Sequence, residues 1–274
     1  MTKTTIGPVW PTFRLVNTPD AADTAHASIH RGADQIVEQP PNGRVFRTSR
    51  RVSIDDCSPA GRMECDAIAR FLQDAGNDDT DDAGLDEFGL AWVARRATIE
   101  IDVGPQAREL LQIATWCSGT GRRWAERSTQ LRGDRGGLVN ASVIWIHIDA
   151  HTGRPASWGA GFADNYLVAT QGRRVDAKLR HSTDVAEDAV QVPWRFRATD
   201  MDAFGHVNNA AYLALVEQVW GEGALTSPAR IEIEWRKPSL ASEDLMLHAT
   251  ETQLWLTEPG SGELRVSATC TPLK

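Results

Sequence analysis

The stretch TDMDAFGHVNN, residues 199–209, says most about the fold and chemistry of this chain. Gly205 follows Asp202 and can adopt backbone angles closed to other residues, which favours a tight turn. Asn208 or Asn209 can cap a helix that begins directly after the turn. A carboxylate beside unpaired N–H groups at a helix start suits hydrolysis of an activated carbonyl. The acid orients or deprotonates water while the amides polarise the carbonyl oxygen. The alternative is an ordinary turn and a capped helix, since Asp, Gly and Asn are common turn residues.

The patterns of apolar residues predict the same order of elements twice. In the first half they predict a strand at 45–52, a helix at 62–75 and four strands at 90–103, 110–118, 122–131 and 138–149. In the second half they predict a strand at 190–199, a helix at 208–220 and strands at 230–236, 245–252, 253–257 and 264–271. We therefore expect an α+β fold of two tandem units, each an antiparallel sheet wrapped around a long helix. Pairing of the two sheets edge to edge removes two aggregation-prone edges, so we expect an internal pseudo-dimer.

Changes in composition, and the Gly- and Pro-containing breaks between the apolar patterns, divide the chain into four segments. We expect a loosely ordered arm at 1–43, a first unit at 44–152, a linker at 153–189 and a second unit at 190–274. After the first helix, the run Asp78-Asp79-Thr80-Asp81-Asp82 is predicted to be a solvated loop, because clustered like charges repel each other and gain nothing from burial. Apolar residues on one face of each helix should pack under the sheet: Met63, Ala67, Ile68, Phe71 and Leu72 in the first, Tyr212, Leu215, Val216 and Val219 in the second.

Bulk properties exclude several classes of protein. The chain has 274 residues, 41% of them hydrophobic, and a formal net charge of −8, which gives no positive field for general nucleic-acid binding. Its four cysteines form no Cys-x-x-Cys pair and no disulfide framework, which favours a reducing, cytoplasmic setting. No stretch approaches the roughly 20 apolar residues of a membrane span. The histidines lack the spacing of a zinc site, so we expect no metal and no cofactor.

Several motifs outside this stretch accompany the doubled order of elements. In the first half they are Trp92-Val93, Arg95-Arg96, Thr115-Trp116, Gly119, Arg127, residues 143–149 and residues 152–155; in the second half they are Tyr212 and Glu234-Trp235-Arg236. With the Gly-His-Val-Asn-Asn string, this set resembles the acyl-acyl carrier protein thioesterase family, whose members have a double hotdog fold. The resemblance implies hydrolysis of acyl-acyl carrier protein to a fatty acid and the carrier thiol. It implies an acyl carrier protein and a fatty acyl thioester as partners, and it is compatible with a homodimer.

The chain departs from the plant members of this family at three positions. Phe204 stands where they have an asparagine, and Pro238 and Ser239 stand where they have a glutamate-cysteine pair. Neither that second carboxylate nor the thiol nucleophile is carried over. The string from Asp202 onward, with Glu217, is similar to single-hotdog acyl-CoA thioesterases of the hydroxybenzoyl-CoA type, in which an aspartate at this position is the principal catalytic group.

Asp202 is the leading catalytic candidate, as general base or as nucleophile. His206 is the second, because an imidazole can bond the thioester oxygen, move a proton or hold Asp202. The expected substrate-binding residues are Phe204, Val207, Asn208 and Asn209. Glu217 is expected to be an ordinary exposed helical glutamate. Ser239 lacks the turn and the histidine of a serine nucleophile.

The first half lacks the Asp-x-x-Gly-His string, so it is expected to bind the acyl chain while the second half supplies the chemistry. Its arginines at 95, 96, 122, 123, 127 and 132 form either a patch for an acidic carrier or a merely solvated face. Two other functions stay open at this level: an acyl-CoA thioesterase, and a module that binds acyl thioesters without hydrolysing them.

Overall fold

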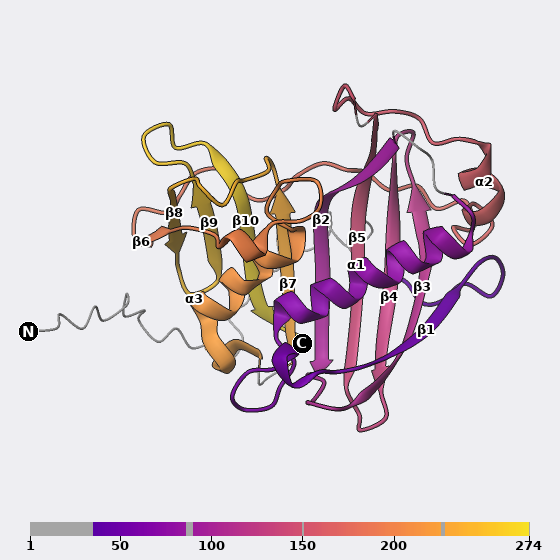
Figure 1. The fold of residues 1–274 in the computed structure, drawn as a ribbon, viewed down its shortest axis with the longest axis horizontal. Helices are drawn as coiled ribbons and strands as arrows, with labels where there is room; N and C mark the ends of the chain where they lie inside the picture. Colours follow the sequence, from indigo (N-terminus) through magenta and orange to yellow (C-terminus); the bar gives the residue numbers. More distant parts are fainter. Residues whose placement is uncertain (1–34, 86–89, 150, 226–227, 274) are drawn as a thin grey trace, which may run out of the picture.

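The computed structural model describes residues 35–85, 90–149, 151–225 and 228–273, so most of the expected N-terminal arm, residues 1–34, lies outside the described residues. Within these ranges, ten strands form one continuous antiparallel sheet in the order β1-β3-β4-β5-β2-β7-β10-β9-β8-β6 (Figure 1). The strands are β1 (Phe46–Arg51), β2 (Leu90–Val103), β3 (Leu110–Thr120), β4 (Trp124–Gly133), β5 (Leu138–Asp149), β6 (Val190–Trp194), β7 (Ala229–Trp235), β8 (Leu245–Ala249), β9 (Gln253–Thr257) and β10 (Leu264–Pro272).

The helices follow the order that the sequence predicts. The long ones are α1 (Cys65–Asp82) in the first half and, in the second, the 3₁₀ helix η3 (Asn209–Leu213) continued by α3 (Ala214–Leu225). Shorter ones are η1 (Ile54–Asp56), α2 (Ala160–Tyr166) and η2 (Ala198–Asp200). None of the helices in the described ranges combines the length and the apolar character that crossing a bilayer requires.

The sheet repeats its strand order about its centre, where β2 pairs with β7. Strands β1-β3-β4-β5-β2 on one side correspond to β6-β8-β9-β10-β7 on the other. At the joint Ile99 lies opposite Ile231 and Glu100 lies opposite Arg230, with which it forms an ion pair. Each of these two strands would otherwise be an open edge. The predicted α+β pseudo-dimer, a double hotdog fold, is confirmed.

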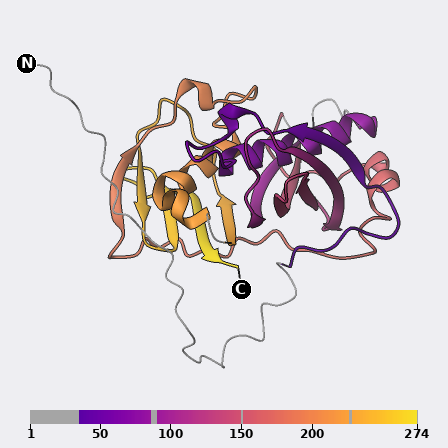
Figure 2. The same cartoon turned by 90° about the horizontal axis from the view of Figure 1, so that it is seen from below.

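Both long helices lie on the same side of the sheet, which curves around them (Figure 2). The predicted apolar face of each helix is buried, and both faces belong to one core cluster: Ala67, Ile68, Phe71 and Leu72 in α1, and Tyr212, Leu215, Val216 and Val219 in η3 and α3. Burial of each large apolar side chain contributes about 1.5–3 kcal/mol. Since α1 and η3 also pack against each other, the two units share a single core.

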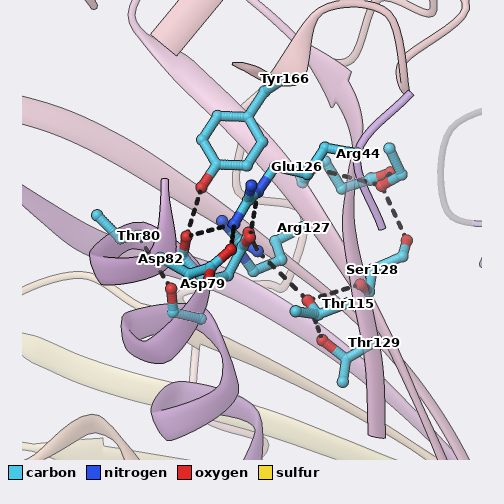
Figure 3. Close-up of polar contacts among 12 residues, drawn as sticks. Arg44, Asp79, Thr80, Asp82, Thr115, Glu126, Arg127, Ser128, Thr129 and Tyr166 are labelled. Atoms are coloured by element: carbon cyan, nitrogen blue, oxygen red, sulfur yellow. Dashed lines mark hydrogen bonds and ion pairs between the residues drawn. The ribbon is translucent and has the colours of Figure 1, made fainter. Parts of the chain in front are cut away.

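The acidic run 78–82 is helical, so the loop expected there is wrong. Helix α1 continues through it to Asp82, and Gly84, two residues later, has a positive φ of 67°. Asp79 is completely buried and forms ion pairs with Arg44, at 2.6 Å from Nε to Oδ1, and with Arg127 (Figure 3). The hydroxyl of Tyr166 donates to the Asp79 carbonyl oxygen at 3.3 Å. Arginines distant in sequence supply the counter-charge that makes burial of this carboxylate favourable.

The segment after α2 runs along the side of the sheet opposite the helices (Figure 2). Asp176 Oδ1 lies 3.3 Å from Nη1 of Arg96, and the Trp255 Nε1–H donates to the Ser182 carbonyl oxygen at 3.1 Å. At the preceding residue, the His181 N–H donates to Glu234 at 3.2 Å. This segment therefore contacts strands of both units while it connects them.

Candidate active site

The turn that carries Asp202 and His206 is held by its own backbone. The Asp202 N–H donates to the His206 carbonyl oxygen (2.8 Å), and the Gly205 N–H donates to that of Asp202 (3.1 Å). Asp202 Oδ1 accepts the N–H groups of Phe204 (2.9 Å) and His206 (3.3 Å). Within the described part of the chain, Oδ2 of Asp202 has no hydrogen-bond partner. Asp202 is half-buried, whereas His206 and Phe204 are exposed, Phe204 by 80%. One carboxylate oxygen thus fixes the turn and the other is available.

The helix that follows begins at Asn209. Asn208 is its cap, as the sequence predicts, and its side-chain oxygen accepts the Ala210 N–H at 2.8 Å. Val207 is buried, and its N–H donates to the Ser239 carbonyl oxygen at 2.9 Å, which joins the turn to the loop before β8. The Asn209 N–H donates to no group among the residues that the structure describes. It is an unpaired amide at the start of a helix.

A mostly apolar cavity of about 30 Å³ lies between α1, η3 and the centre of the sheet. Its lining comes from α1 (Ala69, Leu72, Gln73), β2 (Ala94, Ala97, Ile99), β5 (Val143, Trp145), β7 (Trp235) and η3 (Asn209, Ala210, Leu213). Both units therefore contribute. Among these lining residues, Asn209 is the only one predicted as part of the site. Asp202 and His206 lie in the adjoining turn, outside the lining.

The first unit contains a copy of this turn, which aligns residue for residue without a gap. Gly61 and Gly205 have the same positive φ of 80°, and a bridge joins Cys57 to Met63 as one joins Met201 to Val207. The backbone hydrogen bonds repeat: Ser58 N–H to Arg62 (2.9 Å) as Asp202 N–H to His206 (2.8 Å), Gly61 N–H to Ser58 (2.8 Å) as Gly205 N–H to Asp202 (3.1 Å), and Glu64 N–H to Asp56 (3.0 Å) as Asn208 N–H to Asp200 (2.8 Å). Ser58 thus replaces Asp202, and Arg62 replaces His206.

In the first-unit copy, Glu217 of α3 occupies the helix start. Its Oε1 accepts the N–H of Cys65, the first residue of α1, at 3.0 Å. Its Oε2 lies 3.2 Å from Nη2 of Arg62. The Glu217 side chain is only 16% exposed, so the expectation of an ordinary exposed glutamate is wrong. The fold therefore holds a negatively charged oxygen against one of its two equivalent helix starts.

The other candidate nucleophiles in the described ranges, apart from half-buried Cys57, are buried. Ser239 is completely buried, so its hydroxyl is not accessible as a nucleophile, and its N–H donates to the Tyr212 hydroxyl at 3.0 Å. Burial raises the pKa of Cys117 to about 11 and that of Cys270 to about 12, and it raises the pKa of Cys65 well above its ordinary value. These thiols are therefore protonated near neutral pH and are not thiolate nucleophiles.

The first-half arginines do not form a single patch. Arg127 pairs with buried Asp79, and Arg96 contacts Asp176 on the opposite side of the sheet, while Arg122 is exposed. Sequence reasoning also missed Gln73 and the duplicated turn. The signal for the turn was present as an Asp and a Gly five positions apart, at 56 and 61 and again at 200 and 205.

Comparisons with known proteins agree with the fold and the doubled organisation. The family model of the acyl-ACP thioesterase N-terminal domain matches residues 43–166, and that of the acyl-ACP thioesterase C-terminal domain matches residues 183–261. The solved acyl-ACP thioesterase of Bacteroides thetaiotaomicron has a TM-score of 0.69 and 18% identity, covering 83% of this chain and 97% of its own. The 12:0-ACP thioesterase of Umbellularia californica has a TM-score of 0.67 and 17% identity, covering 85% and 99%. These likenesses show the fold.

Sequence relatives span bacteria and plants. An uncharacterised protein of Mycobacterium tuberculosis is 28% identical over 214 residues, which cover 77% of this chain and 85% of that protein. A chloroplast palmitoyl-acyl carrier protein thioesterase of Arabidopsis thaliana is 25% identical over 203 residues, 68% of this chain and 48% of the plant protein. Because family models match both halves in their natural order, the chain belongs to the acyl-ACP thioesterase family.

Proposed function

We propose that the protein hydrolyses the thioester of acyl-acyl carrier protein at the Asp202 turn and the Asn209 helix start. The observation that carries this proposal is the difference between the two copies of the turn. In the first copy the Cys65 N–H binds a carboxylate oxygen of Glu217 at 3.0 Å. In the second copy the equivalent Asn209 N–H has no partner among the described residues, and Asn209 lines an apolar cavity. The second copy therefore has a vacant place for a developing oxyanion.

The acyl chain enters the cavity between α1 and the sheet, and the thioester carbonyl oxygen accepts the Asn209 N–H. Because about 10–15 Å³ accommodates one water, a cavity of about 30 Å³ is far smaller than a fatty acyl chain. Lining side chains such as Leu72 and Trp145 must therefore move when substrate binds.

Asp202 then acts through its free Oδ2, since Oδ1 is held by two backbone amides. It removes a proton from the attacking water, or it attacks the carbonyl carbon and forms an anhydride that water opens. His206, which is exposed in the same turn, donates a proton to the leaving thiolate. Both routes release a fatty acid and the carrier thiol.

The test is turnover of acyl-acyl carrier protein, measured as free thiol, for the wild type and Asp202→Asn. We expect kcat to fall by about a hundredfold to ten-thousandfold, the usual contribution of a positioned acid or base, with an unchanged melting temperature. The matched control is Ser58→Ala, at the equivalent position of the first copy, which should keep full activity. Turnover that survives in Asp202→Asn would refute the assignment.

A comparison of acyl-acyl carrier protein with acyl-CoA of the same acyl chain tests which carrier the enzyme prefers, separately from whether it hydrolyses thioesters. We expect a higher kcat/KM with the carrier-protein thioester. A higher kcat/KM with acyl-CoA would remove the carrier-protein claim and leave the thioesterase. Tight binding of acyl thioesters without any thiol release would instead identify the non-hydrolytic module.

A further inference from the structure

Gln73, on α1 of the first unit, lies at the cavity that reaches the helix start of the second unit. It is half-buried and lines the same cavity as Asn209 and Ala210. Its side-chain amide makes no hydrogen bond within the described ranges. An amide carries two N–H donors and an acceptor, which a bound substrate can satisfy. The part of the fold that the structure describes gives this amide no partner.

The duplicated turn identifies the counterpart of Gln73. Cys65 and Asn209 are the first residues of equivalent helices, and Gln73 and Glu217 each stand eight positions later. Glu217 reaches across the joint and accepts the Cys65 N–H at 3.0 Å. Because the two units are related by a pseudo-twofold axis, Gln73 should approach Asn209 as Glu217 approaches Cys65. Gln73 and Asn209 line the same cavity, which agrees with this expectation.

We propose that Gln73 completes the thioester site, with its Nε2–H donating to the same carbonyl oxygen that accepts the Asn209 N–H. This inference rests on the proposed function and adds to it a group from the first unit. It follows that the first unit supplies more than a binding surface for the acyl chain, because one of its side chains touches the reacting carbonyl.

The two copies differ in the group at this position, which is a carboxylate in the first copy and an amide in the second. An ionised glutamate only accepts hydrogen bonds, and Glu217 accepts the Cys65 N–H. Arg62 forms an ion pair with the Glu217 carboxylate. Gln73 is uncharged and has two N–H donors beside its acceptor oxygen, and within the described ranges it does not accept the Asn209 N–H. One of its donors can therefore lie beside the Asn209 N–H, and the two together stabilise an oxyanion.

Hydrolysis assays on three variants test this role. In Gln73→Ala we expect kcat to fall about a hundredfold, as for loss of one oxyanion donor, and KM to rise by no more than about three- to tenfold, the effect of one neutral hydrogen bond to the ground-state carbonyl. In Gln73→Glu the loss should be greater, because the carboxylate would accept the Asn209 N–H as Glu217 accepts that of Cys65. Its activity relative to wild type should rise as the pH falls towards about 4.3, the ordinary pKa of glutamate. Asn77→Ala, at an exposed position one turn along α1, should match wild type.

Binding measurements separate this inference from the proposed function. The probes are a ketone analogue of the acyl-carrier thioester, which keeps the carbonyl oxygen, and a thioether analogue, which lacks it. Gln73→Ala should weaken binding of the ketone about three- to tenfold, the usual effect of one neutral hydrogen bond, and leave that of the thioether unchanged. Equal affinities for the ketone in both proteins, or equal weakening for both probes, would overturn the role of Gln73. If wild type binds the ketone as expected but hydrolyses nothing, the proposed function fails and the role of Gln73 stands. If wild type binds neither probe, both fail.

Discussion

Neutralising Asp79 is expected to destabilise the protein far more than neutralising Asp82, although both acids pair with Arg44 near the end of α1 (Figure 3). The Asp79 side chain is 0% exposed, and it also pairs with Arg127, whose side chain is 15% exposed. Removal of one partner of a buried ion pair leaves an uncompensated charge and costs about 3–5 kcal/mol. In the Asp79→Asn variant Arg44 still forms its ion pair with Asp82, so Arg127 is the main residue left with an uncompensated charge.

The Asp82 side chain is 60% exposed, so its pair with Arg44 is screened by water. For Asp82→Asn we expect a loss below about 1 kcal/mol. This variant is a matched control, because it changes the same residue type, on the same helix, beside the same arginine.

Urea unfolding followed by tryptophan fluorescence measures both losses, and the chain has 10 tryptophans to report on it. The double variant Asp79→Asn with Arg127→Gln completes a mutant cycle. We expect the second change to cost much less in the Asp79→Asn background than in the wild type. Equal losses in the Asp79 and Asp82 variants, or additivity in the cycle, would refute the buried pair as a source of stability.

Two further changes test the pH dependence and the cavity. The pKa of Glu232 is lowered to about 2, by His181 and then by Arg230, so its carboxylate should stabilise the fold above about pH 4.5, with the contribution lost as the pH falls towards 2. Glu232→Gln should therefore be less stable than wild type at pH 7, and the difference in unfolding free energy should disappear in acid. The loss at pH 7 should be modest because the side chain is 36% exposed. A constant difference in unfolding free energy across this range would contradict this. Leu72→Ala enlarges the cavity at a cost of about 2–5 kcal/mol in stability, and it should move the kcat/KM optimum towards longer acyl chains in a chain-length series; an unmoved optimum would place the acyl chain elsewhere.

Local sequence patterns were sufficient for the strands, the two long helices and the turn, but not for α2, which lies in the expected linker, or for the end of α1. Alternating and helical periodicities of apolar residues predict the strands and both buried helix faces, because those periods follow from backbone geometry alone. The capping role of Asn208 is equally local, since its side chain bonds the backbone two residues on. These features depend on neighbours in the chain.

The sequence by itself determined the doubled α+β architecture, the Asp202 turn and the helix that follows it. Only the tertiary structure decided which polar groups are paired. The run 78–82 is helical because Arg44 and Arg127 neutralise Asp79 from 35 and 48 residues away. The two copies of the turn share only an Asp and a Gly, so their equivalence lies in backbone hydrogen bonds rather than in side chains. Contacts across the joint between the units place the Glu217 carboxylate on the helix start of the first copy, whereas Asn209 and Gln73 line a cavity in the second. Such contacts depend on long-range electrostatics and packing, which the periodicity of the sequence does not encode.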